Sequence, residues 1–173
     1  MTNIRREKGF SLVELMIVVF IAMVLMGFAI PVVISSIRNY NLNSASSNMS
    51  RMVQLARYAA IRQGSPACTV LEGTFFGVDA NCSGALDNIE QRFALPVGVT
   101  LSAAGPATTT MDFSAAPTVV ASPYVITFTA RGSSAAAPTV SLVYITGWGN
   151  TNAVTVTGTG RARSWRYSGS AWQ

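Results

Sequence analysis

Histidine is absent from this 173-residue chain, and only seven acidic residues stand against twelve Lys and Arg. Without histidine, the chain lacks the usual general base of a Ser or Cys triad and the commonest metal ligand. A glycine-rich phosphate-binding loop is absent too. The few acids form no close pair in the sequence, although pairing in space stays open. The sequence therefore predicts a protein that is not an enzyme, with no catalytic residue, no metal and no cofactor.

Cysteine is equally scarce, because Cys68 and Cys82 are the only two, with thirteen residues between them. They form no Cys-x-x-Cys redox motif, and two cysteines without histidine make a poor zinc site. A disulfide between them would stabilise the fold by about 3 kcal/mol in the chain-entropy model. Such a bond persists outside the cytoplasm. The alternative is two unpaired thiols.

Charge is missing from residues 15–34, a run of twenty residues that contains no amide side chain either. A helix of this length spans about 30 Å, the thickness of a bilayer's hydrocarbon core. Arg5, Arg6 and Lys8 precede the run, opposed only by Glu7. By the positive-inside rule, the leader stays in the cytoplasm and the chain after about residue 38 is translocated.

A secretory signal or a plain membrane anchor are the simpler interpretations of this N-terminus. A signal peptide would need a cleavage site, for which residues 43–46 are a weak candidate, and its apolar region is usually 7–15 residues long. Neither interpretation explains why Glu14 lies just inside the apolar segment. A carboxylate in that position is costly unless a partner pairs with it.

The hexapeptide 9–14, Gly-Phe-Ser-Leu-Val-Glu, resembles the class III leader of type IV prepilins and type II secretion pseudopilins. The resemblance implies that a prepilin peptidase cuts between Gly9 and Phe10 and that Phe10 becomes the N-methylated terminus. Glu14, fifth in the mature chain, takes the place of the assembly glutamate. Pro31 falls where the family has a helix-bending proline, although a kink without a role in assembly is the alternative.

Filament assembly would supply the missing partner of Glu14. In a bundle of apolar helices, the α-ammonium of Phe10 from a neighbouring subunit is expected to meet this carboxylate. Removing one member of such a buried pair costs several kcal/mol, so Glu14 would also set the register between subunits. Pro31 has no N–H and clashes with the preceding turn, which predicts a bend or local melting at residues 27–31.

An amphipathic pattern continues the helix beyond the membrane, to about Gln63, and residues 64–66 (Gly-Ser-Pro) predict its end. The predicted fold class is α+β: a long N-terminal transmembrane and amphipathic helix packed on a C-terminal antiparallel β-sheet head. The expected divisions are 1–9 (cleaved leader), 10–37 (transmembrane and assembly helix), 38–64 (amphipathic continuation) and 65–173 (head). The apolar stripe comprises Leu42, Ala45, Met49, Met52, Val53, Ala56 and Ala60.

Short β-prone runs separated by Gly, Pro, Ser and Asn follow residue 66. Turns are expected at 147–150 and 158–160, and the Ala/Ser/Thr/Pro-rich stretches 102–123 and 132–138 are expected to be loops. The predicted strands are 67–71, 75–79, 97–101, 110–113, 124–130, 139–146, 153–157 and 161–167.

Three segments of the body are similar to the GspH/FimT-type minor pilins and pseudopilins. They are 55–64 (Leu-Ala-Arg-Tyr-Ala-Ala-Ile-Arg-Gln-Gly), 126–132 (Ile-Thr-Phe-Thr-Ala-Arg-Gly) and 160–163 (Gly-Arg-Ala-Arg). Ala130 departs from the proline that is usual before Arg-Gly in that branch.

The last 61 residues contain four arginines and no acid. Arg161 and Arg163 are expected on one face of a strand, with Arg166 close by and Trp165, Tyr167 and Trp172 among or near them. Guanidinium groups hold phosphate and aromatic rings stack on bases, and the resemblance implies DNA binding during uptake. The alternative is a solvated edge strand, or a contact to neighbouring subunits.

The predicted function is therefore a minor pilin or pseudopilin, a structural subunit of a type IV pilus or a type II secretion pseudopilus. Its expected partners are prepilin peptidase, other pilin or pseudopilin subunits and the inner membrane, with the head outside the cytoplasm. The alternative is a pilus-associated DNA receptor for natural transformation that uses Arg161, Arg163 and Arg166.

Overall fold

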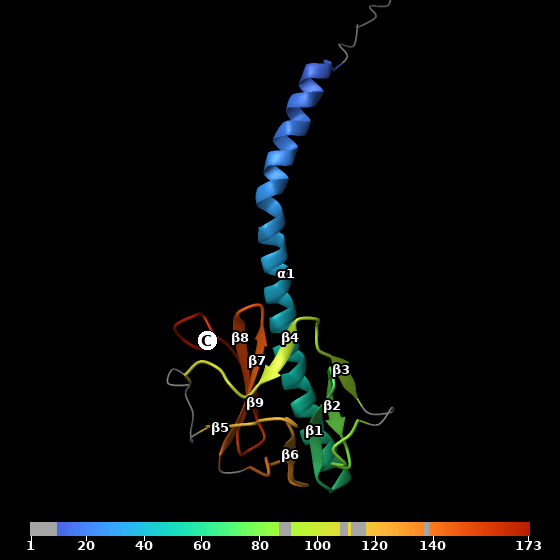
Figure 1. The fold of residues 1–173 in the computed structure, drawn as a ribbon. Coiled ribbons are helices and arrows are strands. Elements are labelled where there is room, and N and C mark those ends of the chain that lie inside the picture. Colours follow the sequence, from blue (N-terminus) through green and yellow to red (C-terminus); the bar gives the residue numbers. More distant parts are fainter. Residues whose placement is uncertain (1–9, 87–90, 108–110, 112–116, 137–138) are drawn as a thin grey trace, which may run out of the picture. The chain divides into compact units, whose positions relative to one another are not determined.

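The computed structural model describes residues 10–86, 91–107, 111, 117–136 and 139–173. The chain divides into two units, residues 1–37 and 38–173, each described by itself below. One helix, α1, supplies residues to both (Figure 1). The elements are α1 (Leu12–Gln63), β1 (Ala67–Glu72), β2 (Phe75–Asp79), β3 (Arg92–Ala94), β4 (Val99–Ser102), β5 (Pro117–Val119), β6 (Ile126–Phe128), β7 (Val140–Gly147), β8 (Asn150–Val156) and β9 (Ala162–Arg166).

The described part of the first unit is the N-terminal portion of α1. Its apolar stretch reaches a mean hydropathy of 3.0, and its length and composition are sufficient to cross a membrane. Pro31 lies inside the helix, which is continuous from Leu12 onward. The local melting predicted at residues 27–31 is therefore wrong. A proline removes one hydrogen bond, and the long helix on both sides keeps the remaining ones.

In the second unit, one face of α1 is buried in the core of the head. The buried positions are spaced by three and four residues, which confirms the predicted amphipathic pattern, and only Met52 of that set is half-buried. Ser46 joins the buried set because its Oγ–H donates to the carbonyl of Asn43 at 2.9 Å. The buried residues of α1 are Leu42, Ala45, Ser46, Met49, Val53, Ala56 and Ala60.

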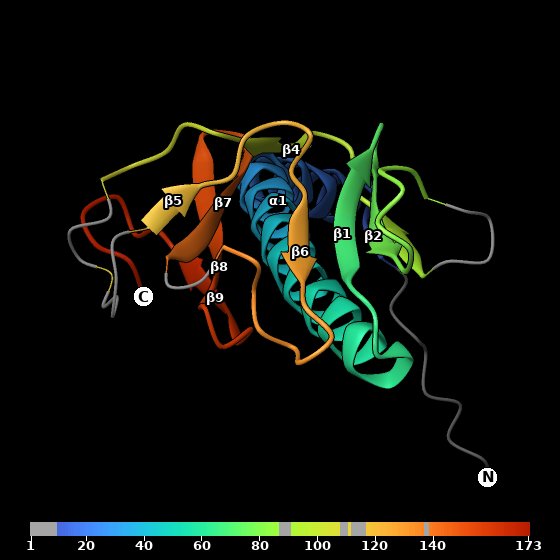
Figure 2. The ribbon, with the colours of Figure 1, turned by 90° about the horizontal axis from the view of Figure 1, so that it is seen from below.

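Two sheets, rather than the single one expected, enclose this part of α1. The first has the order β3-β2-β1-β6, and the second has the order β4-β7-β8-β9 with β5 also paired to β7. Figure 2 shows β7 and β8 on one side of α1 and β1 and β2 on the other. Both sheets contribute to one core around the helix, including Phe76 and Phe128 from the first and Val143 and Val154 from the second. The antiparallel prediction holds for every described pair except β5–β7, which is parallel.

Strand positions agree best where the apolar runs are long. The predicted strand 75–79 is found unchanged as β2, and six others appear with shifted ends as β1, β4 and β6 to β9. The turn predicted at 147–150 is confirmed as the β7–β8 connection, where Trp148 and Gly149 have φ of 51° and 82°. Two positive φ angles in a two-residue turn match the twist of a hairpin. The predicted strand 110–113 lies outside the described residues except for Met111, which is not in a strand.

Two short strands were missed. β3 has three residues and pairs with β2, and β5 lies inside the stretch 102–123 that was expected to be a loop. β5 occupies the edge of β7 that β4 leaves free, because β4 pairs with residues 144–147 and β5 with residues 140–142. Such short segments become strands because a neighbouring edge offers hydrogen bonds, which their own sequence does not indicate.

Candidate functional sites

The start of α1 places Glu14 in the first helical turn. Ser11 immediately precedes the helix, and its carbonyl accepts the N–H of Leu15 at 3.1 Å. The spacing Ser11-x-x-Glu14 is that of a capping box, and an acid in the first turn also interacts favourably with the helix dipole. The position of Glu14 is therefore favourable for the start of the helix, and its role in assembly stays a prediction. Gly9 lies outside the described residues, so cleavage between Gly9 and Phe10 stays a prediction.

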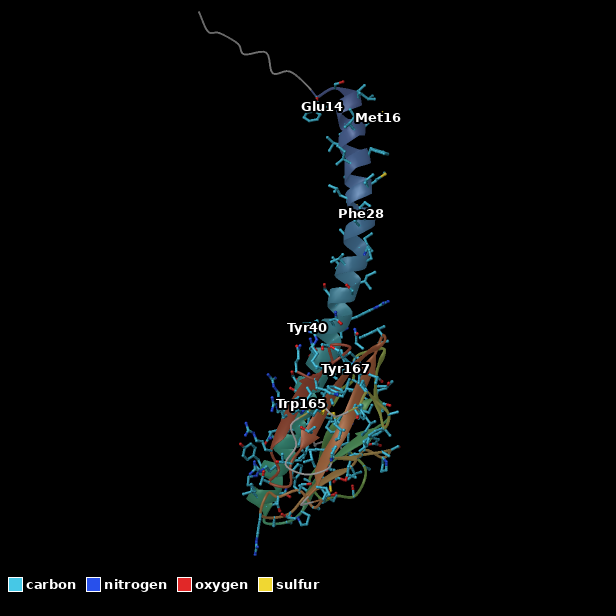
Figure 3. The ribbon with its side chains drawn as sticks, turned by 90° about the vertical axis from the view of Figure 1, so that its left-hand side faces the viewer. Glu14, Met16, Phe28, Tyr40, Trp165 and Tyr167 are labelled. Carbon is cyan, nitrogen blue, oxygen red and sulfur yellow. A yellow bond between two sulfur atoms is a disulfide. The ribbon has the colours of Figure 1, made fainter. Side chains whose placement is uncertain are left out.

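The remaining described residues of the first unit present an apolar surface in all directions. Phe10 and Phe28 are each 74% exposed, and Met16 is 65% exposed. Figure 3 shows Met16 and Phe28 projecting from the helix. An apolar surface of this size requires lipid or other apolar helices to cover it. Pro31 is exposed in the same segment.

The C-terminal arginines lie at the edge of the second sheet. β9 is the last strand in the order β4-β7-β8-β9, and Arg163 and Arg166 are opposite Thr155 and Asn152 of β8. Because side chains alternate along a strand, Arg163 lies on one face of the sheet and Arg166 on the other. Arg161 precedes β9 and donates its backbone N–H to Thr157 Oγ1 at 3.2 Å. All three arginines are exposed.

The two tryptophans among or near these arginines are buried and not available to stack on bases. Trp165 is 6% exposed and Trp172 is 5% exposed. Trp165 Nε1–H donates to Thr155 Oγ1 at 2.9 Å, and the guanidinium of Arg163 lies 3.9 Å from the centre of its ring. Tyr167 is half-buried and packs on Trp172, with ring centres 5.0 Å apart. The prediction of base stacking by these residues is therefore wrong, because they form a small core on the outer face of the sheet.

The three segments that resemble the GspH/FimT branch meet at one point in the head. Arg57 Nε–H donates to the carbonyl of Gly132 at 3.0 Å. A Cβ added to Gly160 would stand 2.3 Å from that same carbonyl oxygen and 3.1 Å from Arg57 Cδ. Gly132 and Gly160 have φ of 77° and 79°, a region that suits glycine. The sequence indicated the three segments separately, and only the fold shows that they form one junction.

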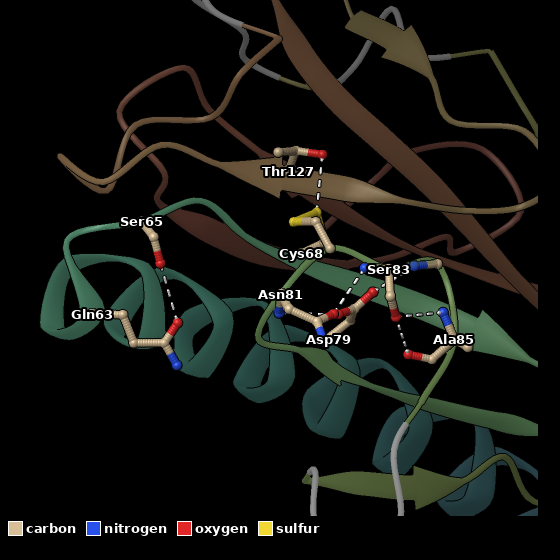
Figure 4. The surroundings of a disulfide bond; sticks show 10 residues. Gln63, Ser65, Cys68, Asp79, Asn81, Ser83, Ala85 and Thr127 are labelled. Atoms are coloured by element: carbon tan, nitrogen blue, oxygen red, sulfur yellow. Dashed lines mark hydrogen bonds between the residues drawn. A yellow bond between two sulfur atoms is a disulfide. The ribbon is translucent and has the colours of Figure 1, made fainter.

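The disulfide predicted as one of two alternatives is present in the structure. It joins Cys68 in β1 to Cys82 in the loop after β2, with the two Cα atoms 5.2 Å apart (Figure 4). Cys68 is buried in a small cluster with Val70 and Leu86. The bond therefore ties the loop that begins at Asp79 to the first sheet.

A long N-terminal apolar helix whose continuation is enclosed by β-sheets defines the pilin-like fold. Residues 4–30 match the model of the prokaryotic N-terminal methylation motif. The structure is similar to that of the type IV minor pilin FimU of Pseudomonas aeruginosa, with a TM-score of 0.52 and 17% identity over 78% of this chain and 94% of that one. The chain is therefore pilin-like in fold and carries the N-terminal motif of prepilins.

A second crystal form of FimU matches with a TM-score of 0.49 and 18% identity, covering 70% of this chain and 90% of that chain. No match was found among curated protein sequences. The relationship to the GspH/FimT branch stays a prediction.

Proposed function

We propose that this protein is a minor pilin, a membrane-anchored structural subunit that assembles through α1. The observation that carries the proposal is the combination of the methylation motif at 4–30 with an exposed apolar stretch at the start of α1 on a pilin-like fold. In this proposal, prepilin peptidase removes residues 1–9. Before assembly, the N-terminal part of α1 anchors the subunit in the inner membrane, with the head outside the cytoplasm. Assembly then replaces lipid around the exposed helix by the helices of other pilin subunits. The genes that neighbour this one distinguish a type IV pilus from a type II secretion pseudopilus.

The chemistry of assembly follows from the same segment. Cleavage creates an α-ammonium on Phe10, four residues before Glu14. No other charged side chain lies between Phe10 and Arg38. In this proposal, a neighbouring subunit shifted along the bundle brings its Phe10 α-ammonium to the Glu14 carboxylate. A charge pair in an apolar bundle fixes the register between neighbouring helices, because a shift of one helix leaves both charges unpaired. The pilin-like fold is that of a structural protein, and we propose no catalytic role.

Mass spectrometry of the protein isolated from cells tests the proposed function. The expected N-terminal peptide begins with N-methylphenylalanine, corresponds to Phe10 and lacks the nine preceding residues. Replacing Gly9 by a bulky residue is expected to leave the leader in place, because the peptidase would no longer recognise the site. Retention of residues 1–9 in the native protein, or loss of the whole apolar segment, would contradict the proposal.

DNA binding is the second candidate function, and one observation favours it. The contact between Gly132 and Gly160 brings together the two loops that carry Arg131 and Arg161, both of which are exposed. Arg57 approaches the same junction and has one N–H engaged by Gly132. Several guanidinium groups in one region attract phosphate. Since the nearby tryptophans are buried, any such binding would be carried by charge rather than by base stacking.

A gel-shift experiment at low salt decides this second candidate. The double variant Arg161→Gln with Arg163→Gln is expected to bind duplex DNA about tenfold or more weakly than the parent, since each lost phosphate contact weakens binding. The matched control is Arg51→Gln with Arg62→Gln, which removes two exposed charges from α1. An equal effect of both pairs would indicate general charge attraction, and no shift by the parent protein would leave only the structural role.

A further inference from the structure

The loop after β2 has the spacing of a calcium-binding loop, which the sequence analysis above missed. Residues 79–84 read Asp-Ala-Asn-Cys-Ser-Gly. In such loops, oxygen ligands occupy positions one, three and five, a glycine allows the sharp turn at position six, and a backbone carbonyl binds from position seven. Asp79, Asn81, Ser83, Gly84 and Ala85 occupy these positions in order, with Ser in place of a third Asp or Asn. Positions nine and twelve are acidic in the sequence and lie outside the described residues.

Asp79 carries a second and independent indication of a cation. Its side chain is completely buried, and no Lys or Arg in the described part of the chain forms an ion pair with it. The guanidinium of Arg92, on the adjacent hairpin, lies over the ring of Phe75 instead, 5.1 Å from its centre. Buried charges in proteins are paired or coordinate metals, because an uncompensated carboxylate is costly to bury. Among the described residues, the carboxylate of Asp79 therefore has no compensating cation.

The carboxylate has acceptor capacity left for such a cation. Asp79 Oδ1 accepts the N–H of Asn81 at 3.2 Å, and Oδ2 accepts the N–H of Gly84 at 2.7 Å. A carboxylate offers about four acceptor positions, and these two bonds occupy two of them. Both donors are backbone groups of the same loop, so they orient the carboxylate without neutralising its charge.

Further oxygens of the loop face the same region. Asn81 Oδ1 accepts the N–H of Ser83 at 2.9 Å, and Ser83 Oγ accepts the N–H of Ala85 at 3.3 Å. Figure 4 shows the side chains of Asp79, Asn81 and Ser83 gathered together, with Ala85 beside them. The loop is anchored on both sides, because Cys82 is tied to Cys68 and Glu72 Oε2 accepts the N–H of Leu86 at 2.8 Å. Ser83 Oγ and the carbonyl oxygen of Ala85 lie 3.3 Å apart, so these two oxygens are close together before any ligand arrives.

We propose that this loop binds one Ca²⁺ ion through the side chains of Asp79, Asn81 and Ser83 and the carbonyl of Ala85. The set consists of oxygen atoms and contains neither imidazole nor thiolate, which suits a hard cation better than zinc. In the described residues, no three His, Cys, Asp or Glu side chains form a metal cluster, which agrees with a set built on one carboxylate, an amide, a hydroxyl and a carbonyl. Bound Ca²⁺ compensates the charge of Asp79 and fixes the loop against β1. This inference is independent of the proposed function.

Calorimetric titration of the full chain in detergent tests the site with Ca²⁺ and Mg²⁺ as the probes. The expected dissociation constant for Ca²⁺ is on the order of 10⁻⁴ to 10⁻³ M, the range of extracellular calcium modules, and Mg²⁺ is expected to bind about tenfold or more weakly. Asp79→Asn is expected to weaken Ca²⁺ binding by at least about tenfold, since it removes the charge at position one. The matched control is Asp112→Asn, which makes the same change of charge elsewhere in the chain and is expected to leave the affinity unchanged.

A variant that binds Ca²⁺ more tightly than the parent distinguishes a calcium site from a loop with only a structural role. Asn81→Asp adds a carboxylate at position three, where the residue is exposed, and is expected to tighten Ca²⁺ binding severalfold. This variant keeps the test decisive if Asp79→Asn does not fold. The proposal is wrong if the parent chain shows no Ca²⁺ binding at about 10 mM. It is also wrong if Asp79→Asn binds as tightly as the parent, or if Asn81→Asp does not tighten binding.

Discussion

Glu14→Ala is expected to yield a protein that is processed and inserted into the membrane but is nearly excluded from filaments. The change removes one member of the proposed charge pair and leaves the Phe10 α-ammonium of a neighbouring subunit buried and unpaired. Breaking a buried ion pair in this way costs about 3–5 kcal/mol, which corresponds to a more than 100-fold loss of incorporation. The measurement is the ratio of the variant to the parent in sheared filaments, with equal amounts of both in the membrane.

Two controls separate the charge of Glu14 from its place in the capping box. Glu14→Gln keeps a side chain that is compatible with the capping box, so it is expected to be excluded as strongly as Glu14→Ala. Ser11→Ala removes the capping hydroxyl and keeps the charge, so it is expected to be incorporated at about the level of the parent. Normal incorporation of Glu14→Gln would show that the carboxylate acts on the helix start and not on a neighbouring subunit.

Gly160→Ala is expected to destabilise the head strongly. The new Cβ would stand 2.3 Å from the carbonyl oxygen of Gly132, so the backbone of one loop has to move. The alanine would also be held at a φ of 79°, which costs roughly 1–2 kcal/mol. Overpacking adds about 1–3 kcal/mol. Denaturant unfolding of the full chain in detergent measures the sum.

The matched control for this variant is Gly149→Ala. Gly149 has a φ of 82°, almost that of Gly160, but a Cβ added there meets no atom within 4 Å. It is therefore expected to cost only the roughly 1–2 kcal/mol of the unfavourable backbone conformation. Equal losses of stability in the two variants would mean that the junction of Arg57, Gly132 and Gly160 yields without cost. Close packing at this junction would then not explain why the segments 55–64, 126–132 and 160–163 all resemble the same branch.

The course of α1 could be predicted because its periodicity is long. Twenty uncharged residues followed by an apolar stripe at spacings of three and four leave one interpretation, a helix exposed at its start and buried on one face later. Asn39, Asn43 and Ser46 are compatible with that helix because each meets a polar partner. Asn152 Nδ2–H donates to Asn43 Oδ1 at 2.9 Å and to Ser46 Oγ at 3.3 Å, and Asn150 Nδ2–H donates to Asn39 Oδ1 at 2.9 Å. These contacts join residues more than 100 positions apart, so no local pattern indicated them.

The candidate sites divide in the same way. The proposed N-terminal site is contiguous, so Phe10, Glu14 and Pro31 could be proposed from their spacing alone. The arginines could be counted in the sequence, but their neighbourhood could not. Trp165 is buried because it faces the outer cluster with Tyr144 and Trp172, and its partner Thr155 comes from the adjacent strand. The signal for the proposed calcium loop was present in the spacing from Asp79 to Gly84, and the burial of Asp79 supports the proposal.

The sequence by itself determined the elements whose residues are consecutive: an apolar anchor with one acid near its start, an amphipathic helix and a series of short strands. The tertiary structure decided which residues from distant segments share an environment. It divided the strands between two sheets around α1, buried Trp165 and Trp172, and brought Arg57 close to the two glycine loops. The physical reason is the separation along the sequence of the residues involved. Helical periodicity and charge-free runs are properties of neighbouring residues. Strand partners, buried charges and backbone contacts depend instead on which surfaces meet once the apolar face of the helix is enclosed.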